Sequence, residues 1–266
     1  MTETGPAHIR SRDNAWLKEL RRLTQDSSAY RKQGRVWLEG DHLCRAALQR
    51  GVQAQVAVFA ASYWQTAPAQ WAQGALKVVV LEDRLFADIS ALESPAQIGF
   101  VLELASLSPE LACIERHGAS VILDRVQDAG NVGSILRSAS AFGFKQVLAL
   151  KGTAALWSPK VLRAGMGAHF GLQLFEGLDV GELDRLDVPL VTTSSHQGAF
   201  LHRQSLPMPC AWALGHEGQG VSEAVAGRSA LKVRIAQPGG EESLNVAAAA
   251  AICLHASSVA EPTLGQ

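Results

Sequence analysis

The sequence lacks several features that would place it in a familiar class of protein. In its 266 residues no apolar stretch approaches the length of a membrane-spanning helix, and Met1–Arg10 has no apolar signal core. The four cysteines, Cys44, Cys113, Cys210 and Cys253, are scattered and form no C-x-x-C pair. This spacing predicts neither a zinc site nor a disulfide framework. We therefore expect no metal, no membrane association and a reducing, cytoplasmic setting.

The chain also lacks a strong excess of charge, with 24 Lys and Arg against 25 Asp and Glu. The charge is unevenly distributed, however. Residues 1–50 carry ten Lys/Arg and six Asp/Glu, a difference of +4, whereas residues 51–107 carry two and five, a difference of −3. The first fifty residues are the best candidate for a surface that faces phosphate groups. A solvated, charged helix is the alternative interpretation.

Alternating strand and helix patterns predict two α/β domains, residues 1–105 and 106–266, joined by the linker Ala105–Glu110. In the first domain we predict strands at Arg35–Leu38, Val56–Ala60, Lys77–Leu81 and Ile98–Leu104, helices at Asp13–Thr24, Asp41–Arg50, Tyr63–Gln73 and Arg84–Ser90, and a loop at Ser27–Gly34. In the second domain we predict strands at Val121–Leu123, Gln146–Leu150, Leu172–Phe175, Leu190–Thr193, Ala211–Leu214 and Leu231–Ile235. The helices between them are predicted at Leu111–His117, Ser134–Phe142, Ser158–Ala164, Val180–Leu186, Val221–Ala226 and from Ser243 to about Ser257. This pattern is typical of a mostly parallel sheet with helices on both faces.

No G-x-G loop follows the first strand of the second domain, where an ordinary nucleotide-binding α/β protein would carry it. Glycines gather late in the chain instead, at Leu214–Gly220 and at Pro238–Gly240, each directly after a predicted strand. Glycine lets the backbone turn sharply and approach a ligand closely. Two such loops at neighbouring strand ends predict a pocket lined by backbone N–H groups.

Three segments carry a more specific pattern. The first reads Asn131-x-Gly133-x-x-x-Arg137, the second Leu214-Gly215-x-Glu217-x-x-Gly220, and the third Ile235 with Gly239 and Ser243-Leu244-Asn245-Val246. In this order and spacing they resemble the SpoU/TrmH family of RNA ribose 2′-O-methyltransferases, within the SPOUT superfamily. The resemblance implies a C-terminal trefoil knot. The segment Arg35–Leu48 resembles, more loosely, the start of the L30e-like substrate-binding domain that many family members carry before the catalytic domain.

The resemblance also implies the cofactor S-adenosylmethionine, held by Thr193, Gly215, Ile235 and Leu244. Transfer of its methyl group to a ribose hydroxyl requires no metal. The expected cofactor contacts are largely backbone groups with apolar walls, although Ile235 and Leu244 could equally serve core packing.

Arg137 is the expected centre of the chemistry. It can fork onto a phosphate beside the target ribose, or take part in removing the proton of the 2′-hydroxyl, as proposed for the family. Guanidinium is nearly always protonated, which makes it a poor base. Without the motif, a surface salt bridge with Asp128 would be the preferred interpretation.

The remaining candidates for the catalytic site are Asn131, Glu217, Ser243 and Asn245, for which a structural role is an equal alternative. Asn131 could cap the helix of Arg137 or orient Arg137, and Glu217 could anchor Asn131 or Asn245. Ser243 or Asn245 could cap the last helix. His196 and His216 lie near the pocket but match no family position, and they are expected to be bystanders.

The resemblance of the N-terminal domain to that of the rRNA-directed members implies a ribosomal RNA substrate, specifically 23S RNA, and DNA is not expected. A tRNA substrate and an inactive RNA-binding protein of the same fold are the alternatives. Two departures from the family pattern leave the loop shape and the RNA preference open. Ala236-Gln237 stand where Pro-Met is common, and Glu241-Glu242 place acidic charge near the expected RNA.

A homodimer is also expected. The last helix, from Leu244 to Ser257, is apolar on most sides and must be covered, either by its own domain or by a partner. The resemblance favours the partner, because the family pairs through this region.

Overall fold

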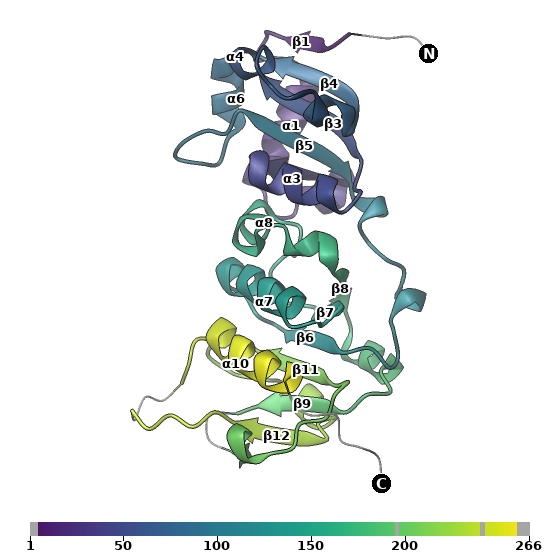
Figure 1. Ribbon diagram of the computed structural model, residues 1–266, viewed down its shortest axis with the longest axis vertical. Coiled ribbons are helices and arrows are strands. Elements are labelled where there is room, and N and C mark those ends of the chain that lie inside the picture. Colours follow the sequence, from purple (N-terminus) through teal and green to yellow (C-terminus); the bar gives the residue numbers. More distant parts are fainter. Residues whose placement is uncertain (1–4, 195–196, 240–242, 260–266) are drawn as a thin grey trace. The chain divides into compact units, whose positions relative to one another are not determined.

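The computed structural model describes residues 5–194, 197–239 and 243–259 (Figure 1). The chain divides into two compact units. Unit 1 comprises Met1–Leu107 together with Trp157–Phe170, and unit 2 comprises Ser108–Leu156 with Gly171–Gln266. The segment 157–170, which the sequence pattern assigned to the second domain, thus packs within unit 1. In the described ranges no helix is both long and apolar enough to span a membrane.

Unit 1 is built on a mixed sheet of five strands in the order β1-β4-β3-β5-β2. β1, β4 and β3 run parallel, and β5 is antiparallel to β3 and to β2. The strands are β1 Ala7–Ile9, β2 Arg35–Glu39, β3 Ala54–Ala60, β4 Ala75–Leu81 and β5 Ile98–Glu103. The helices are α1 Ala15–Gln25, α2 Ala29–Gln33, α3 Asp41–Gln49, α4 Ala61–Trp64, α5 Ala69–Gln73, α6 Asp83–Ile89, the short 3-10 helix η1 Leu104–Ser106 and, from the later segment, α8 Pro159–Gly165.

The local sequence explains most of these elements. In α1 the side chain of Asn14 accepts a hydrogen bond from the backbone N–H of Leu17, and the helix buries Leu17, Leu20 and Leu23 on one face. Two predictions for this unit were wrong. Ser27–Gly34 contains α2 and is not only a loop, and Tyr63–Gln73 is two short helices because Pro68 stands between them. α3 begins after Gly40, with no side-chain cap.

Unit 2 is built on a parallel sheet of seven strands in the order β10-β12-β9-β11-β6-β7-β8. The strands are β6 Ser120–Asp124, β7 Gln146–Leu150, β8 Gln173–Leu178, β9 Leu190–Thr193, β10 Ala199–Phe200, β11 Ala211–Gly215 and β12 Leu231–Arg234. The helices are α7 Ala129–Ala141, α9 Glu223–Ala226, α10 Val246–Ser258 and the 3-10 helices η2 Leu111–Cys113, η4 Val180–Arg185 and η5 Leu201–Arg203; η3, Ala168–Gly171, closes the inserted segment. The α/β prediction with a mostly parallel sheet is confirmed.

The strands at the centre of this sheet are apolar along their length because they are buried. Every residue of β6, β7 and β11 is buried, as expected for a parallel sheet. The predicted helix at Leu111–His117 was wrong beyond its first turn. Ile114 is extended and packs into the core of the sheet, which ends the 3-10 helix at Cys113.

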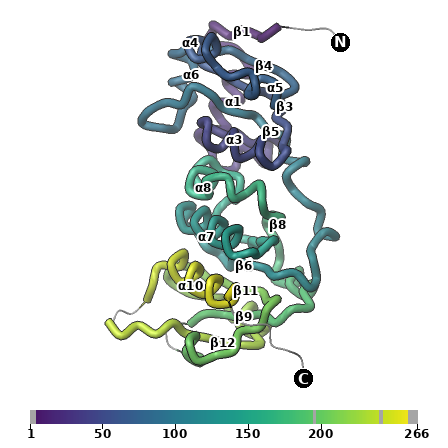
Figure 2. Tube along the Cα trace, in the orientation of Figure 1, coloured from purple at the N-terminus to yellow at the C-terminus, as the bar shows by residue number. Residues whose placement is uncertain are grey.

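Two helices distant in sequence, α7 and α10, pack side by side in unit 2 (Figure 2). A buried hydrogen bond fixes α10 to the sheet, since the indole N–H of Trp212 on β11 donates to the hydroxyl of Ser257 at 2.8 Å. The third sequence motif, at the start of α10, therefore lies close to the first motif on α7.

Candidate active site

The carboxyl ends of three neighbouring strands, β12, β9 and β11, open into one pocket of unit 2. Its volume is about 490 Å³, within the usual range for sites of small ligands. All four residues assigned to the cofactor line it, namely Thr193 at the end of β9, Gly215 at the end of β11, Ile235 after β12, and Leu244 before α10. The structure thus brings together positions spread over 52 residues of sequence.

Seven consecutive residues, 215–221, form one wall of the pocket and require glycine at its base. A Cβ on Gly215 would lie 2.1 Å from the carbonyl carbon of Gly220, a distance that no side chain tolerates. The chain closes on itself here because His216 and Gly220 exchange two backbone hydrogen bonds, of 3.0 and 2.8 Å. Gly220 has a φ of +68°, which glycine adopts without strain.

A chain of hydrogen bonds joins the three sequence motifs beside the pocket. The side-chain amide of Asn245 donates to Oδ1 of Asn131 at 2.8 Å, and the amide of Asn131 donates to Oε1 of Glu217 at 3.1 Å. Oδ1 of Asn245 accepts the N–H groups of Ala247 and Ala248 and so caps α10. The orientation of both side-chain amides follows from the two ends of this chain of bonds. At one end, backbone N–H groups require the oxygen of Asn245, and at the other, the carboxylate of Glu217 requires the NH2 group of Asn131.

Glu217 is held in its ionised form by this arrangement. Besides Asn131, its carboxylate accepts the backbone N–H groups of Gln127 and Asp128. Partial burial alone would raise the pKa of Glu217, but the hydrogen bond from Asn131 and those from backbone N–H groups outweigh it and lower the pKa. The carboxylate therefore acts as an acceptor that fixes the start of α7.

Arg137 lies apart from this chain of bonds. It is exposed on α7, does not line the pocket, and forms no hydrogen bond or ion pair with another described residue. The alternative of a salt bridge with Asp128 was wrong, since Asp128 instead caps α7 by accepting the N–H of Asn131. Asn131 is thus not the cap of its own helix, and it is free to join the two later motifs.

Ser243, the remaining candidate, is exposed, lines the pocket, and does not cap α10. Gly240, Glu241 and Glu242 lie outside the described residues, as does His196.

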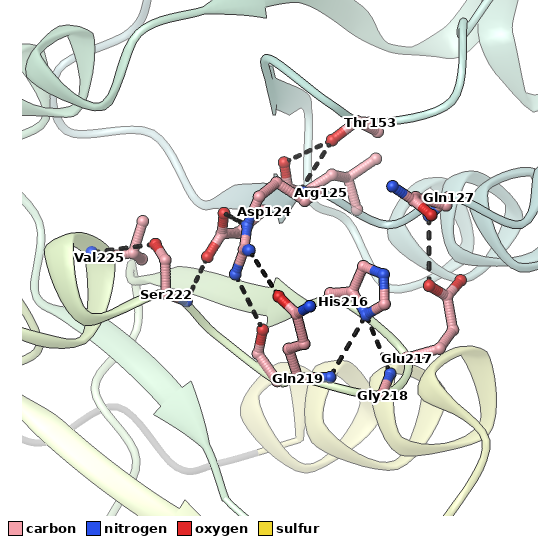
Figure 3. A network of polar contacts seen from close by, with 12 residues as sticks. Asp124, Arg125, Gln127, Thr153, His216, Glu217, Gly218, Gln219, Ser222 and Val225 are labelled. Carbon is pink, nitrogen blue, oxygen red and sulfur yellow. Dashed lines mark hydrogen bonds and ion pairs between the residues drawn. The ribbon is translucent and has the colours of Figure 1, made fainter.

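The sequence motifs did not predict a second polar network, which lies beside the glycine loop (Figure 3). Asp124 and Arg125 at the end of β6 contact Gln219, Gly220 and Ser222. His216, expected to be a bystander, accepts the N–H groups of Gly218 and Gln219 at Nδ1 and so shapes the loop. The position of Asp-Arg at a strand end was the available signal. Among described residues, no group of three or more His, Cys, Asp or Glu lies close enough together to hold a metal ion.

With a parallel sheet and a pocket at the carboxyl ends of its strands, unit 2 is of the class of α/β proteins that bind a ligand at this edge of the sheet. Comparison with known proteins identifies the family within this class. Residues 118–255 match the SpoU rRNA methylase family, and residues 14–99 match an MRM3-like substrate-binding domain. The chain belongs to the SpoU rRNA methylase family.

Individual relatives agree with this assignment. The chain is 30% identical over 253 residues to RlmP of Bacillus subtilis, a 23S rRNA (guanosine(2553)-2′-O)-methyltransferase, covering 93% of this chain and 97% of that protein. It is 37% identical over 164 residues to the mitochondrial rRNA methyltransferase 3A of Danio rerio, covering 60% of this chain but only 38% of that longer protein. The fold matches an AdoMet-bound rRNA methyltransferase from Sinorhizobium meliloti with a TM-score of 0.82, at 24% identity, over 94% of this chain and 96% of that one.

Proposed function

We propose that this protein is an S-adenosylmethionine-dependent methyltransferase that methylates a ribose 2′-hydroxyl of ribosomal RNA, specifically 23S RNA. The observation that carries the proposal is the single pocket formed by Thr193, Gly215, Ile235 and Leu244, directly beside the bonded side chains of Asn131, Glu217 and Asn245. Membership of the SpoU rRNA methylase family supports both the reaction and the RNA.

The pocket fits this cofactor chemically. Ile235, Leu244, Val246 and Ala249 supply apolar wall for an adenine ring. The glycine loop contributes backbone N–H and C=O groups with little side-chain bulk in the way. When bound, the cofactor supplies an activated methyl group on a sulfonium sulfur. The protein must hold that group and the ribose oxygen in line and remove the hydroxyl proton.

The other side chains take distinct roles in this proposal. Arg137 forks onto an RNA phosphate next to the target ribose and orients the hydroxyl. Glu217, Asn131 and Asn245 tie the first motif to the glycine loop, so that the RNA side and the cofactor side keep one geometry. Ser243 borders the pocket where substrate and cofactor meet.

The larger organisation belongs to the proposal as well. Residues 1–105 act as an L30e-like RNA-binding domain, supported by the match of residues 14–99 to a substrate-binding domain. Residues 106–266, apart from the segment 157–170 that packs within unit 1, form the methyltransferase domain with a trefoil knot, for which membership of the SpoU rRNA methylase family is the support. Because its four cysteines are free, we place the protein in the reducing cytoplasm.

The protein further acts as a homodimer. A shallow apolar hollow on unit 2 is lined by Phe142, Leu201, His202, Ala251, Ile252, His255 and Ala256. Ile252 on α10 is 41% exposed there, within a mainly apolar surface of the kind that marks interaction sites. A second copy seated on α10 would cover this surface and could bring its Arg137 to the pocket.

The experiment that tests the function is mass mapping of ribosomal RNA from cells that lack the gene. We expect one ribose methyl group to be missing from 23S RNA, and the purified protein with S-adenosylmethionine to restore it in vitro. Unchanged ribosomal RNA with a methyl group missing from a tRNA would overturn the choice of substrate. No missing methyl group in either RNA, and no transfer by purified protein, would overturn the enzyme function.

A further inference from the structure

Arg125 has a backbone conformation that ordinary residues rarely adopt. Its φ is +61°, and Met166 is the only other non-glycine residue of the described chain with a positive φ. For a residue with a Cβ this region costs on the order of 1–2 kcal/mol, a cost that glycine avoids. The arginine side chain must therefore contribute something that a glycine at this turn could not.

The side chain of Arg125 joins the end of β6 to the glycine loop (Figure 3). Nε donates to Oδ1 of Asp124 at 3.1 Å, Nη1 donates to Oε1 of Gln219 at 3.0 Å, and Nη2 donates to the carbonyl oxygen of Gly220 at 3.5 Å. Asp124 is only 2% exposed, and its second oxygen accepts the N–H of Ser222. One guanidinium thus spans a buried carboxylate and two acceptors 94 and 95 residues away.

The position of Arg125 is determined independently of the loop. Its backbone N–H donates to the hydroxyl of Thr153 at 3.1 Å, and that hydroxyl donates to the carbonyl of Leu123 at 2.9 Å. Gly152 leaves room for the arginine stem, since a Cβ there would lie 3.2 Å from Cγ of Arg125. The guanidinium is therefore presented from a rigid strand end.

Arg125 supplies the hydrogen bonds that join Gln219 and Gly220, in the second half of the glycine loop, to the rest of the unit. Glu217 is anchored separately, by Gln127, Asp128 and Asn131. Among the described residues, Gln219 and Gly220 otherwise form hydrogen bonds only with His216, a member of the same loop, through its ring and backbone. Arg125 itself does not line the pocket, whereas Gln219 and Gly220 do.

We propose that Arg125 is a positioning residue for the cofactor, holding Gln219 and Gly220 in the conformation that binds S-adenosylmethionine. The inference rests on the proposed function. Without the arginine, Gln219 and Gly220 keep only hydrogen bonds within the loop, although Glu217 and Ser222 stay anchored on either side. Cofactor binding must then order these two residues, which lowers affinity. We expect chemistry at saturating cofactor to be unaffected, because Arg125 does not itself line the pocket.

The test variant is Arg125→Lys in the full chain. Lysine keeps a positive charge beside buried Asp124 but lacks the fork that reaches both Gln219 and Gly220. We expect the Kd for S-adenosylmethionine, measured by calorimetry, to rise about tenfold, the loss expected for one or two hydrogen bonds. The KM for the cofactor rises in step while kcat is unchanged, and amide exchange quickens at residues 218–221.

Two further variants separate positioning from general stability. Gln219→Ala removes the acceptor and should weaken binding, and the double variant should bind no more weakly than the weaker single variant, because both break one link. Arg116→Lys alters a similar forked ion pair, with Asp187, that does not line the pocket, and it should leave the Kd unchanged.

An unchanged Kd in Arg125→Lys, or strictly additive effects in the double variant, would overturn the proposal. A lower melting temperature with unaltered KM would show a purely structural role and would overturn it too. If the unaltered protein itself binds no S-adenosylmethionine, the proposed function fails first, and the role of Arg125 with it.

Discussion

The side-chain amide of Asn245 donates a hydrogen bond to the amide oxygen of Asn131, 114 positions earlier in the chain, over 2.8 Å. The same Asn245 caps α10 with its own oxygen. One residue therefore starts the last helix and attaches it to the first motif. Because Asn131 passes the connection on to Glu217, a change at position 245 affects all three motifs.

Two substitutions of Asn245 separate its role as helix cap from its hydrogen bond to Asn131. Asn245→Asp keeps an oxygen for the cap but loses the N–H group that donates to Asn131. Its second carboxylate oxygen then repels the amide oxygen of Asn131. We expect melting temperature to change little while methyl transfer falls at least tenfold. Asn245→Ala loses the cap as well, which costs a further ~1 kcal/mol of unfolding free energy. Thermal unfolding and single-turnover assays measure the two effects, and full activity in Asn245→Asp would contradict the linkage.

Arg137→Ala should abolish methyl transfer and leave the Kd for S-adenosylmethionine unchanged, because Arg137 does not line the pocket. Its melting temperature should also stay unchanged, since the side chain is exposed and forms no hydrogen bond or ion pair with a described residue. Arg137→Lys should fail likewise, because lysine cannot form the bidentate fork. A variant that turns over but no longer binds cofactor would refute this assignment.

Glu217 should make stability dependent on acid pH. Its pKa is lowered on folding from the ordinary value of 4.5, so the ionised side chain stabilises the folded protein above that pH. This stabilisation is lost as the pH falls through the lower pKa of the folded state. We expect Glu217→Gln to melt below the unaltered protein at about pH 6–8, and the gap to close in acid below about pH 4.5. Glu93→Gln, which alters an exposed carboxylate without a hydrogen-bond partner among the described residues, should show no such trend.

RNA binding by unit 1 should depend on cations that have no carboxylate partner among the described residues. Arg22 and Arg50 are two of these, both exposed, whereas Arg45 is paired with Asp41 at 3.2 Å. Removing one interaction with a phosphate group should reduce the slope of log K against log salt by roughly 0.7–0.9. We expect Arg22→Ala with Arg50→Ala to flatten the slope, and Arg45→Ala to change it less.

The full chain is required for that measurement. Residues 157–170 pack within unit 1, so a truncation at residue 105 would remove their packing partners along with the charge. An unaltered slope in the double variant would mean that the basic residues form only a solvated surface.

If the dimer shares its sites, two inactive variants should complement each other. Arg137→Ala lacks the RNA contact, and Gly215→Ala cannot hold the cofactor because its Cβ would lie 2.1 Å from Gly220. After subunit exchange, heterodimers should regain up to one working site. Ile252→Asp, on the exposed side of α10, should give a monomer by light scattering and no complementation. Proven exchange without recovered activity would exclude shared sites.

The sequence by itself determined six of the seven strands of unit 2, all but the two-residue β10, and its motifs named four residues that meet in one pocket. The strands were readable because β6, β7 and β11 are buried on both sides and hence continuously apolar. The glycines at 215 and 220 marked a loop that only such residues can form. Where local propensity was the sole guide, as at 111–117, a buried Ile114 overrode it.

Only the tertiary structure decided which side chains touch. Asp128 caps α7 and frees Asn131 for Glu217 and Asn245, 86 and 114 positions away. The forked contact of Arg125 with Gln219 spans 94 positions and depends on β11 lying next to β6, with Gly215 beside Asp124. Strand order in a parallel sheet depends on how the helices pack on both of its faces, which involves the whole domain at once. No local stretch of sequence encodes it. The motifs did predict that Glu217 anchors Asn131, but not the contacts of Asn245 with Asn131 or of Arg125 with Gln219.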